Sequence, residues 1–221
     1  MYTPRHFELA PEHVATLLAT ATTAQLVTAH ADGPVATLLP VAHRPDTDGG
    51  PGSLIFHLTR VNPQWHAPRL GDALAILSGP DGLIDPDWYE GDPSAQVPTW
   101  NYVTVHAYGP LVVHDDASWT HDAVATLSGT HGFDMAGLDA DARDRMLRAI
   151  VGVELPIARV EAKAKLSQNR SPGDVAGAIA GLRAEGSDDL AARMEDLALP
   201  HAVARYALID DVRERRRPTS V

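Results

Sequence analysis

Three short polar segments carry most of the residue types in this chain that could bind a ligand or perform chemistry. The first segment runs from His57 to His66 and also holds Arg60 and Asn62. Asn followed by Pro is typical of a helix N-cap and first helical residue, and helix N-termini favour anions such as phosphate or propionate. An arginine adds a bidentate donor for such a group. An ordinary strand-to-helix turn with a surface arginine has the same pattern, so the residues alone leave both interpretations open.

The second segment, residues 97–106, is a candidate surface for a flat ligand. If it forms a strand, its period of two places Trp100, Tyr102, Thr104 and His106 on one face. Two aromatic rings and an imidazole could stack on a planar ring. They also suit a half-buried barrel face whose polar tips are satisfied, and without further information the residues favour that interpretation.

The third segment, residues 161–170, concentrates positive charge. It contains Lys163, Lys165 and Arg170, and it follows a strand that we expect over residues 154–162. The pattern predicts that this strand ends in a dense polar loop. Functional loops have this composition, and so do solvated loops.

The composition excludes several classes of chemistry. The chain has no cysteine, which excludes disulfides, thiolate catalysis and iron–sulfur clusters. It also lacks a glycine-rich phosphate loop, a Gly-x-Ser-x-Gly elbow and a His-Glu-x-x-His zinc motif. A metal must therefore be held by histidine or carboxylate, or arrive within a cofactor.

The overall charge argues against nucleic acid as a partner. The net charge is −11 over 221 residues, whereas a duplex-binding protein normally presents a basic face. The one short basic run, residues 213–217, suits the end of a solvated helix. The first residues lack the order of a signal peptide, and no apolar run has membrane-spanning length, so we expect a cytoplasmic protein without a membrane partner.

The elements that must position these segments are short strands followed by helices. The pattern predicts strands over residues 25–30, 35–42, 53–58, 73–78 and 154–162, and a strand pair over 99–114 bent at Gly109-Pro110. Residues 79–82 predict a turn after the fourth strand. We expect helices over residues 11–21, 116–130, 139–151 and 171–186, with two further helical stretches after them. This order predicts an antiparallel barrel with added helices rather than a βαβ sheet.

Several motifs, in order, resemble the PaiB-like FMN-binding split-barrel family. They are Met1-Tyr2-x-Pro4-x-His6-Phe7, Asn62 to Trp65, Val97 to His106, Met146 to Gly152, and Lys165 to Asn169. The resemblance implies a mainly antiparallel split β-barrel with added α-helices, of the α+β class, forming a homodimer with cofactor sites at the subunit interface. It implies a split-barrel domain over residues 1–186 and a C-terminal helical extension over 187–221.

The resemblance also implies which residues form the cofactor site. Arg60 and Asn62 would lie at the phosphate end. Trp100, Asn101, Lys163, Lys165, Gln168 and Asn169 would line or support the pocket. With the neighbouring residues of the three polar segments, the full set assigned to cofactor binding is His57, Arg60, Asn62, Trp65, Trp100, Asn101, Ala164, Gln168, Asn169 and Arg170.

The sequence departs from the family pattern at positions that bear on the cofactor. Ala164 replaces an aromatic residue between the two lysines, and His66 stands where a cation often follows the Asn-Pro-Gln-Trp motif. A pocket with one ring fewer, one cation fewer and one imidazole more fits FMN less well, and it suits a wider cofactor such as haem b. The piperazate synthases are a PaiB-like branch of this kind, which closes an N–N bond in a hydroxylated ornithine.

We therefore favour a haem-dependent enzyme that forms piperazate from an amino-acid-like substrate. His66 and His57 are the candidate axial ligands of the iron. Tyr102 or His106 could donate a proton, and Lys163 and Lys165 could hold a propionate or the substrate carboxylate. The alternatives are an FMN-binding flavoprotein and a negative transcriptional regulator, and the acidic charge places the regulator last.

Overall fold

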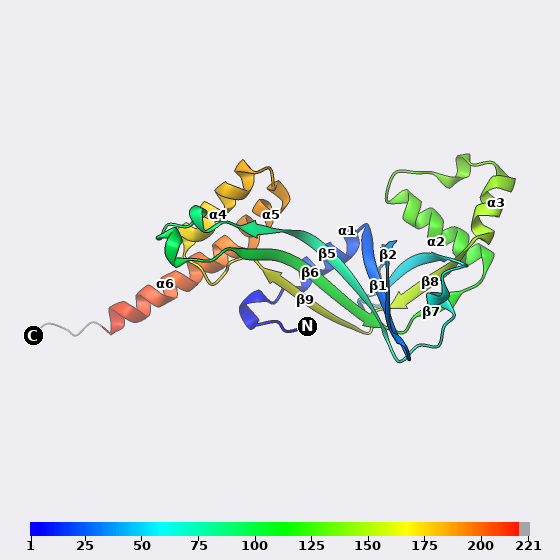
Figure 1. The fold of residues 1–221 in the computed structure, drawn as a ribbon, viewed down its shortest axis with the longest axis horizontal. Helices are drawn as coiled ribbons and strands as arrows, with labels where there is room; N and C mark the ends of the chain where they lie inside the picture. The colour runs from blue at the N-terminus through cyan, green and yellow to red at the C-terminus, as the bar shows by residue number, and fades with distance from the viewer. Residues whose placement is uncertain (217–221) are drawn as a thin grey trace, which may run out of the picture. The chain divides into compact units, whose positions relative to one another are not determined.

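The computed structural model describes residues 1–216 (Figure 1). Its strands are β1 (Thr23–His30), β2 (Gly33–Pro40), β3 (Ala42–Arg44), β4 (Ser53–Thr59), β5 (Ala73–Ile84), β6 (Thr99–Gly109), β7 (Val112–His114), β8 (Ile150–Pro156) and β9 (Arg159–Lys165). Its α-helices are α1 (Pro11–Thr20), α2 (Ala117–Gly129), α3 (Ala140–Arg148), α4 (Pro172–Ala184), α5 (Asp188–Arg193) and α6 (Leu199–Arg215). A π-helical turn, η6 (Met194–Ala198), joins α5 to α6. Within residues 1–216, no helix combines the length and the apolar character needed to cross a membrane.

The strands form two sheets. One has the order β2-β1-β5-β6-β9, and the other has the order β3-β4-β8-β7. Strand β1 pairs antiparallel with β2 and β5, and β8 pairs antiparallel with β4 and β7. Two antiparallel sheets with several helices confirm the expected α+β class.

The chain divides into two compact units. Unit 1 comprises Met1, residues 10–78 and residues 104–162; unit 2 comprises residues 2–9, residues 79–103 and the chain from Lys163 onward. Strands β5, β6 and β9 each contribute residues to both units. The boundary predicted between residues 186 and 187 stays a prediction.

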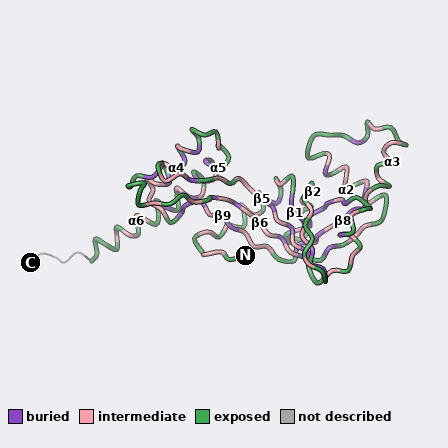
Figure 2. The backbone as a smooth tube through the Cα atoms, viewed as in Figure 1, coloured by how far each residue is buried: buried purple, intermediate pink, exposed green. Residues whose placement is uncertain are grey.

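The core of unit 1 follows from the alternation along its strands. Leu54, Phe56 and Leu58 occupy one face of β4 and are almost fully buried. Ile55 occupies the other face and packs with Ala123 and Leu127 of α2. Both faces of β4 are therefore covered, which explains its nearly continuous apolar sequence. Figure 2 shows buried residues along β1 and β8, whereas exposed residues predominate along α6.

Unit 2 is organised by a row of glycines on helix α4. A Cβ atom at Gly177 would lie 2.0 Å from the Trp88 carbonyl oxygen, and one at Gly181 would lie 2.2 Å from the Trp88 ring. The 3₁₀ turn η3 (Pro86–Trp88) therefore lies directly on α4. The opposite side of α4 buries apolar residues such as Val175 and Leu182.

The turn predicted over residues 79–82 is wrong, because β5 continues through it to Ile84. A Cβ atom at Gly79 would lie 3.1 Å from Val103 Cβ, and one at Gly82 would lie 3.0 Å from Leu190 Cδ2. These glycines permit close packing within a strand rather than a reversal of the chain. Pro80 is tolerated because the pairing of β5 with β1 already ends at Ile76.

The strand predicted over residues 154–162 is also wrong. The structure has two strands there, β8 and β9, which belong to different sheets. The helix predicted to reach residue 151 ends at Arg148, because Ile150 and Val151 already pair with β4. As a result Lys163 and Lys165 lie in strand β9, not in a loop. The strand predicted over residues 35–42 likewise ends at Pro40, and β3 starts in the other sheet.

Candidate functional site

Unit 2 contains a cavity of ≈ 350 Å³ that we call the lysine cavity. It brings together the second and third polar segments and the N-terminal segment. Its lining residues are His6, Phe7, Val97, Pro98, Thr99, Asn101, Lys165, Ser167, Asn169 and Arg170.

Strand alternation separates the two lysines from the alanine between them. Lys163 and Lys165 lie on one face of β9, and Ala164 lies on the other, where it is 2% exposed. Ala164 does not line the lysine cavity. Lys165 Nζ donates hydrogen bonds to Thr99 Oγ1 and to the Trp100 carbonyl oxygen. Burial, and then the charge of Lys163, lower the pKa of the Lys165 amine.

Lys163 is held differently from Lys165. Its residue is 9% exposed, and its Nζ donates to the Tyr2 carbonyl oxygen at 3.3 Å. The same ammonium lies 5.4 Å from the centre of the Tyr102 ring and 5.8 Å from that of Phe7. These aromatic faces stabilise its positive charge, so Lys163 supports the cavity from outside its lining.

A rigid turn after β9 presents the remaining polar groups. Ser167 adopts φ = 66°, the left-handed conformation that residues other than glycine rarely adopt. The Gln168 side chain fixes the turn, because it accepts from Leu166 N at 2.7 Å and donates to the Ala164 carbonyl at 2.6 Å. Gln168 therefore supports the cavity rather than lining it.

Asn101 links this turn to the helical part of unit 2. Its Nδ2 donates to Ser167 Oγ at 3.0 Å and approaches Met194 Sδ, in the π-helical turn, at 3.4 Å. Asn101 is fully buried. Single π turns inside helices often accompany functional sites.

Arg170 supplies a second cation to the lysine cavity. Its Nη1 donates to Gln96 Oε1 at 2.6 Å, and its guanidinium lies 4.3 Å from the centre of the Tyr89 ring. Both partners are neutral. Within residues 1–216, neither Arg170 nor Lys165 forms an ion pair with a carboxylate, and the lining includes no Asp or Glu. The cavity is therefore suited to a small anion.

The first polar segment lies in unit 1, where its arginine is already paired. Arg60 donates to the Arg148 carbonyl at 2.9 Å and to Asp115 Oδ1 at 2.5 Å. That hydrogen bond is the main cause of the lowered pKa of Asp115. Asn62 caps the turn as predicted, since its side chain accepts from Gln64 N, but the turn η2 (Pro63–Trp65) is only a short 3₁₀ helix.

The two candidate axial histidines differ in exposure. The His66 imidazole is exposed, meets the Trp65 ring edge-on at 4.8 Å, and makes no side-chain hydrogen bond within residues 1–216. Trp65 in turn donates to the Arg60 carbonyl. His57 lies on the face of β4 that α2 covers; its Nδ1 is buried without a partner, and burial lowers the pKa of its imidazole. The described chain holds no cluster of three potential metal ligands.

The remaining candidates lie along β6. Tyr102 belongs to unit 2, beneath Lys163, and Trp100 beside it is half exposed. His106 belongs to unit 1, where burial and then the positive N-terminus lower the pKa of its imidazole.

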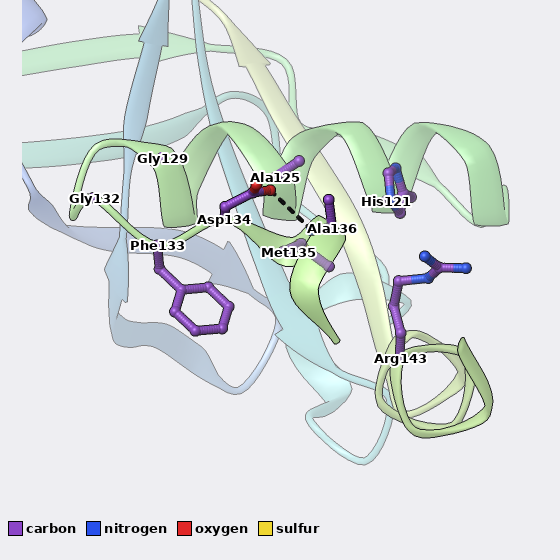
Figure 3. Close-up of a pocket in the computed structure, with 9 residues that line it drawn as sticks. All are labelled: His121, Ala125, Gly129, Gly132, Phe133, Asp134, Met135, Ala136 and Arg143. Atoms are coloured by element: carbon purple, nitrogen blue, oxygen red, sulfur yellow. Dashed lines mark hydrogen bonds between the residues drawn. The ribbon is translucent and has the colours of Figure 1, made fainter. Parts of the chain in front are cut away.

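Unit 1 has a larger cavity, which contains none of the predicted site residues. We call it the insertion cavity; its volume is ≈ 570 Å³ and it lies between α2, the 3₁₀ turn η5 (Met135–Gly137) and α3. Figure 3 shows Phe133 at one end and His121 and Arg143 at the other. The floor between them consists of small residues, including Ala125 and Gly129.

The sequence analysis did not assign six lining residues of the lysine cavity to the site: His6, Phe7, Val97, Pro98, Thr99 and Ser167. All six lie within motifs of the family resemblance, but Thr99 and Ser167 contact Lys165 and Asn101, each 66 positions away, so no local pattern gave them a role. A signal for the cavity did exist. Of the 18 Lys and Arg residues in the chain, only Lys163 and Lys165 are lysines, and they lie two positions apart.

Comparison with known proteins identifies similar chains. A family model described as "Putative FMN-binding domain" matches residues 1–159. The chain is 28% identical over 206 residues to the protease synthase and sporulation protein PAI 2 of Bacillus subtilis, an alignment covering 89% of this chain and 97% of that protein.

Two solved structures share the fold. The flavocytochrome Anf3 of Azotobacter vinelandii matches with a TM-score of 0.55 at 14% identity, over 74% of this chain and 72% of that one. An FAD and haem binding protein of Mycobacterium smegmatis matches with a TM-score of 0.53 at 18% identity, over 71% of each chain.

Proposed function

This chain belongs to the FMN-binding domain family, and we propose that it is a cofactor-dependent enzyme acting on a small carboxylate. The observation that carries the proposal is the lysine cavity, where Lys165 and Arg170 meet no carboxylate within residues 1–216. A charge-assisted pair from Arg170 would bind a carboxylate bidentately.

We favour haem as the cofactor, and the specific reason lies in the first polar segment. Arg60, the predicted cation at the phosphate end of FMN, is already paired with Asp115. Near it, the exposed His66 imidazole has no hydrogen-bond partner among residues 1–216. His66 is therefore the better placed of the two histidines to hold an iron, since α2 covers the face that carries His57.

The favoured reaction is the closure of an N–N bond in a hydroxylated ornithine, giving piperazate and water. The α-amine nitrogen forms the new bond, the N–O bond breaks, and no external oxidant is required. Haem would supply Lewis-acid activation of the hydroxylamine oxygen. Among this chain's own residues, Arg170 would anchor the substrate carboxylate in the lysine cavity.

FMN remains the second candidate, because the matching family is described by it. In that case the lysine cavity would take the phosphate, and the chain would be an oxidoreductase or a flavin carrier. Regulation of transcription ranks below both, given the net charge of −11.

The absorption spectrum of the purified protein, before and after addition of haem or FMN, separates these candidates. A Soret band that His66→Ala removes or shifts, and that the matched variant His57→Ala leaves in place, supports haem held by His66. A flavin spectrum with no uptake of haem would replace the haem proposal by the FMN one.

We also propose that the chain forms a homodimer, as its resemblance to split-barrel proteins implies. Light scattering at working concentrations should give twice the mass of one chain. A monomer under those conditions would remove the basis for a shared cofactor site.

A further inference from the structure

The chain uses arginine for almost every positive charge. Of its 18 Lys and Arg residues, only Lys163 and Lys165 are lysines, and both lie on one face of β9. Arginine and lysine can both supply surface charge, but only lysine offers an amine that loses its proton readily when buried. One of the two, Lys165, lines the lysine cavity, and the other lies two positions away on the same strand face, which points to amine chemistry rather than charge alone.

The surroundings of Lys165 leave its amine available. Nζ donates to two neutral acceptors, Thr99 Oγ1 and the Trp100 carbonyl oxygen. No third acceptor for this nitrogen is found within residues 1–216. A neutral amine has two N–H groups and one lone pair, so these two acceptors engage both hydrogens and leave the lone pair to the cavity that Lys165 lines.

Lys163 keeps the neighbouring amine reactive. Its own ammonium lies against the rings of Tyr102 and Phe7, whose faces stabilise the positive charge. That charge, added to burial, lowers the pKa of the Lys165 amine. A lysine that is desolvated beside another cation is the usual form of a nucleophilic amine in enzymes that bind carbonyl compounds.

The rest of the cavity selects the ligand. Arg170 has only neutral partners, Gln96 and Tyr89, and it lines the same cavity as Lys165. His6 adds an imidazole, and no carboxylate side chain is among the lining residues. A ligand with a carboxylate a short distance from its reactive carbon would meet both cations.

We propose that Lys165 forms an imine with the carbonyl carbon of a small keto or aldehyde acid whose carboxylate is held by Arg170. The amine lone pair forms the C–N bond, the carbonyl oxygen takes up the two amine protons and leaves as water, and a C=N bond results. The step needs no oxidant, reductant or cofactor. It therefore goes beyond the proposed function and can be tested whichever cofactor the protein holds.

The test is reductive trapping with glyoxylate, an aldehyde acid, and cyanoborohydride, followed by peptide mass spectrometry. The side-chain amines available are those of Lys163 and Lys165, so each serves as a reference for the other. We expect the reduced adduct to form faster on Lys165 than on Lys163, because Lys165 lines the cavity and because burial and the charge of Lys163 lower the pKa of its amine. Equal or faster labelling of Lys163 would overturn the proposal.

Variants separate the role of Lys165 in forming the imine from the role of Arg170 in binding the carboxylate. Lys165→Arg should abolish the adduct, whereas Lys163→Arg, which keeps the neighbouring charge, should retain it. Arg170→Gln should slow trapping of glyoxylate by about 10-fold or more while leaving trapping of acetaldehyde, which has no carboxylate, unchanged. If Lys165 reacts with acetaldehyde as fast as with glyoxylate in the unaltered protein, Arg170 does not select the ligand and the proposal fails. Peptide mass spectrometry of the unaltered protein locates the adduct by itself, so the test does not depend on the folding of the variants.

Discussion

The insertion cavity and the lysine cavity differ in size and in chemistry: the larger one has the less distinctive lining, and the smaller one concentrates positive charge. The insertion cavity of unit 1 is the larger, at ≈ 570 Å³, but small residues form its floor and Asp134 contributes a carboxylate. The lysine cavity of unit 2 is ≈ 350 Å³, and it holds Lys165 and Arg170 without a carboxylate in its lining. Volume alone would select the first cavity; charge and hydrogen bonding select the second.

The backbone around the two cavities differs in strain and in packing as well. In unit 2, Ser167 is held in a left-handed conformation by Asn101 and Gln168, and such a conformation costs about 1–3 kcal/mol and persists only where its surroundings enforce it. In unit 1, the glycines that line the insertion cavity, Gly129 and Gly132, border open space, since a Cβ atom added to either would have no neighbour within 4 Å. Strain and close packing therefore accompany the cavity to which we assign a function.

The largest expected effect is on the packing of unit 2. Gly181→Ala should destabilise the protein by about 1–3 kcal/mol, because the new methyl group would overlap the Trp88 ring. Gly129→Ala, also in a helix, meets open space and should be neutral or stabilising by no more than about 1 kcal/mol. Urea denaturation measures the free energy of unfolding of both variants. Equal effects would show that the packing around the glycines of the two units does not differ.

A second effect concerns the buried polar network. Asn101→Leu should cost about 1–3 kcal/mol, since it leaves the buried Ser167 hydroxyl without its partner. His121→Ala in the insertion cavity removes an exposed side chain and should change the free energy of unfolding by less than about 0.5 kcal/mol. If Asn101→Leu leaves the free energy of unfolding unchanged, the hydrogen bonds between Asn101 and Ser167 have no structural role.

The smallest effect is a shift in amine titration. The Lys165 amine should become reactive toward acetic anhydride at lower pH than the amine introduced by Arg143→Lys in the insertion cavity. The sign follows from burial and from the charge of Lys163, which both disfavour the ammonium form and so lower the pKa of the Lys165 amine. Arg170, which lines the same cavity, is also a cation, and the lining includes no carboxylate that would oppose this direction. Lys163→Met should raise the titration midpoint of Lys165. An unchanged midpoint would show that the charge of Lys163 does not lower the pKa of the Lys165 amine.

The sequence predicted the class of fold because its alternating strands and late helices are local patterns. The N-cap at Asn62, the strand bend near Gly109 and the helix beginning after Ser171 were likewise readable from neighbouring residues. The turn at residues 79–82 failed for the opposite reason. Gly79 and Gly82 are required by Val103 and Leu190, which are distant in sequence.

The candidate site was predictable only in part. The segments that contain Asn101, Lys165 and Arg170 stood out by composition, and the structure brings these three residues to one cavity. The role of Ala164 depended on the face of β9, which became clear only when the strand boundaries were known. The pairing of Arg60 with Asp115 joins residues 55 positions apart, so no local pattern could reveal it.

The central claim, that the lysine cavity and not the larger insertion cavity binds a small carboxylate, is tested most directly by calorimetric titration with pyruvate. Each cavity has one lining arginine, which makes Arg170→Gln and Arg143→Gln a matched pair. We expect Arg170→Gln to weaken pyruvate binding by about 10-fold or more, as loss of a charge-assisted hydrogen bond implies, and Arg143→Gln to leave pyruvate binding unchanged. Binding that survives Arg170→Gln and is lost in Arg143→Gln would contradict it.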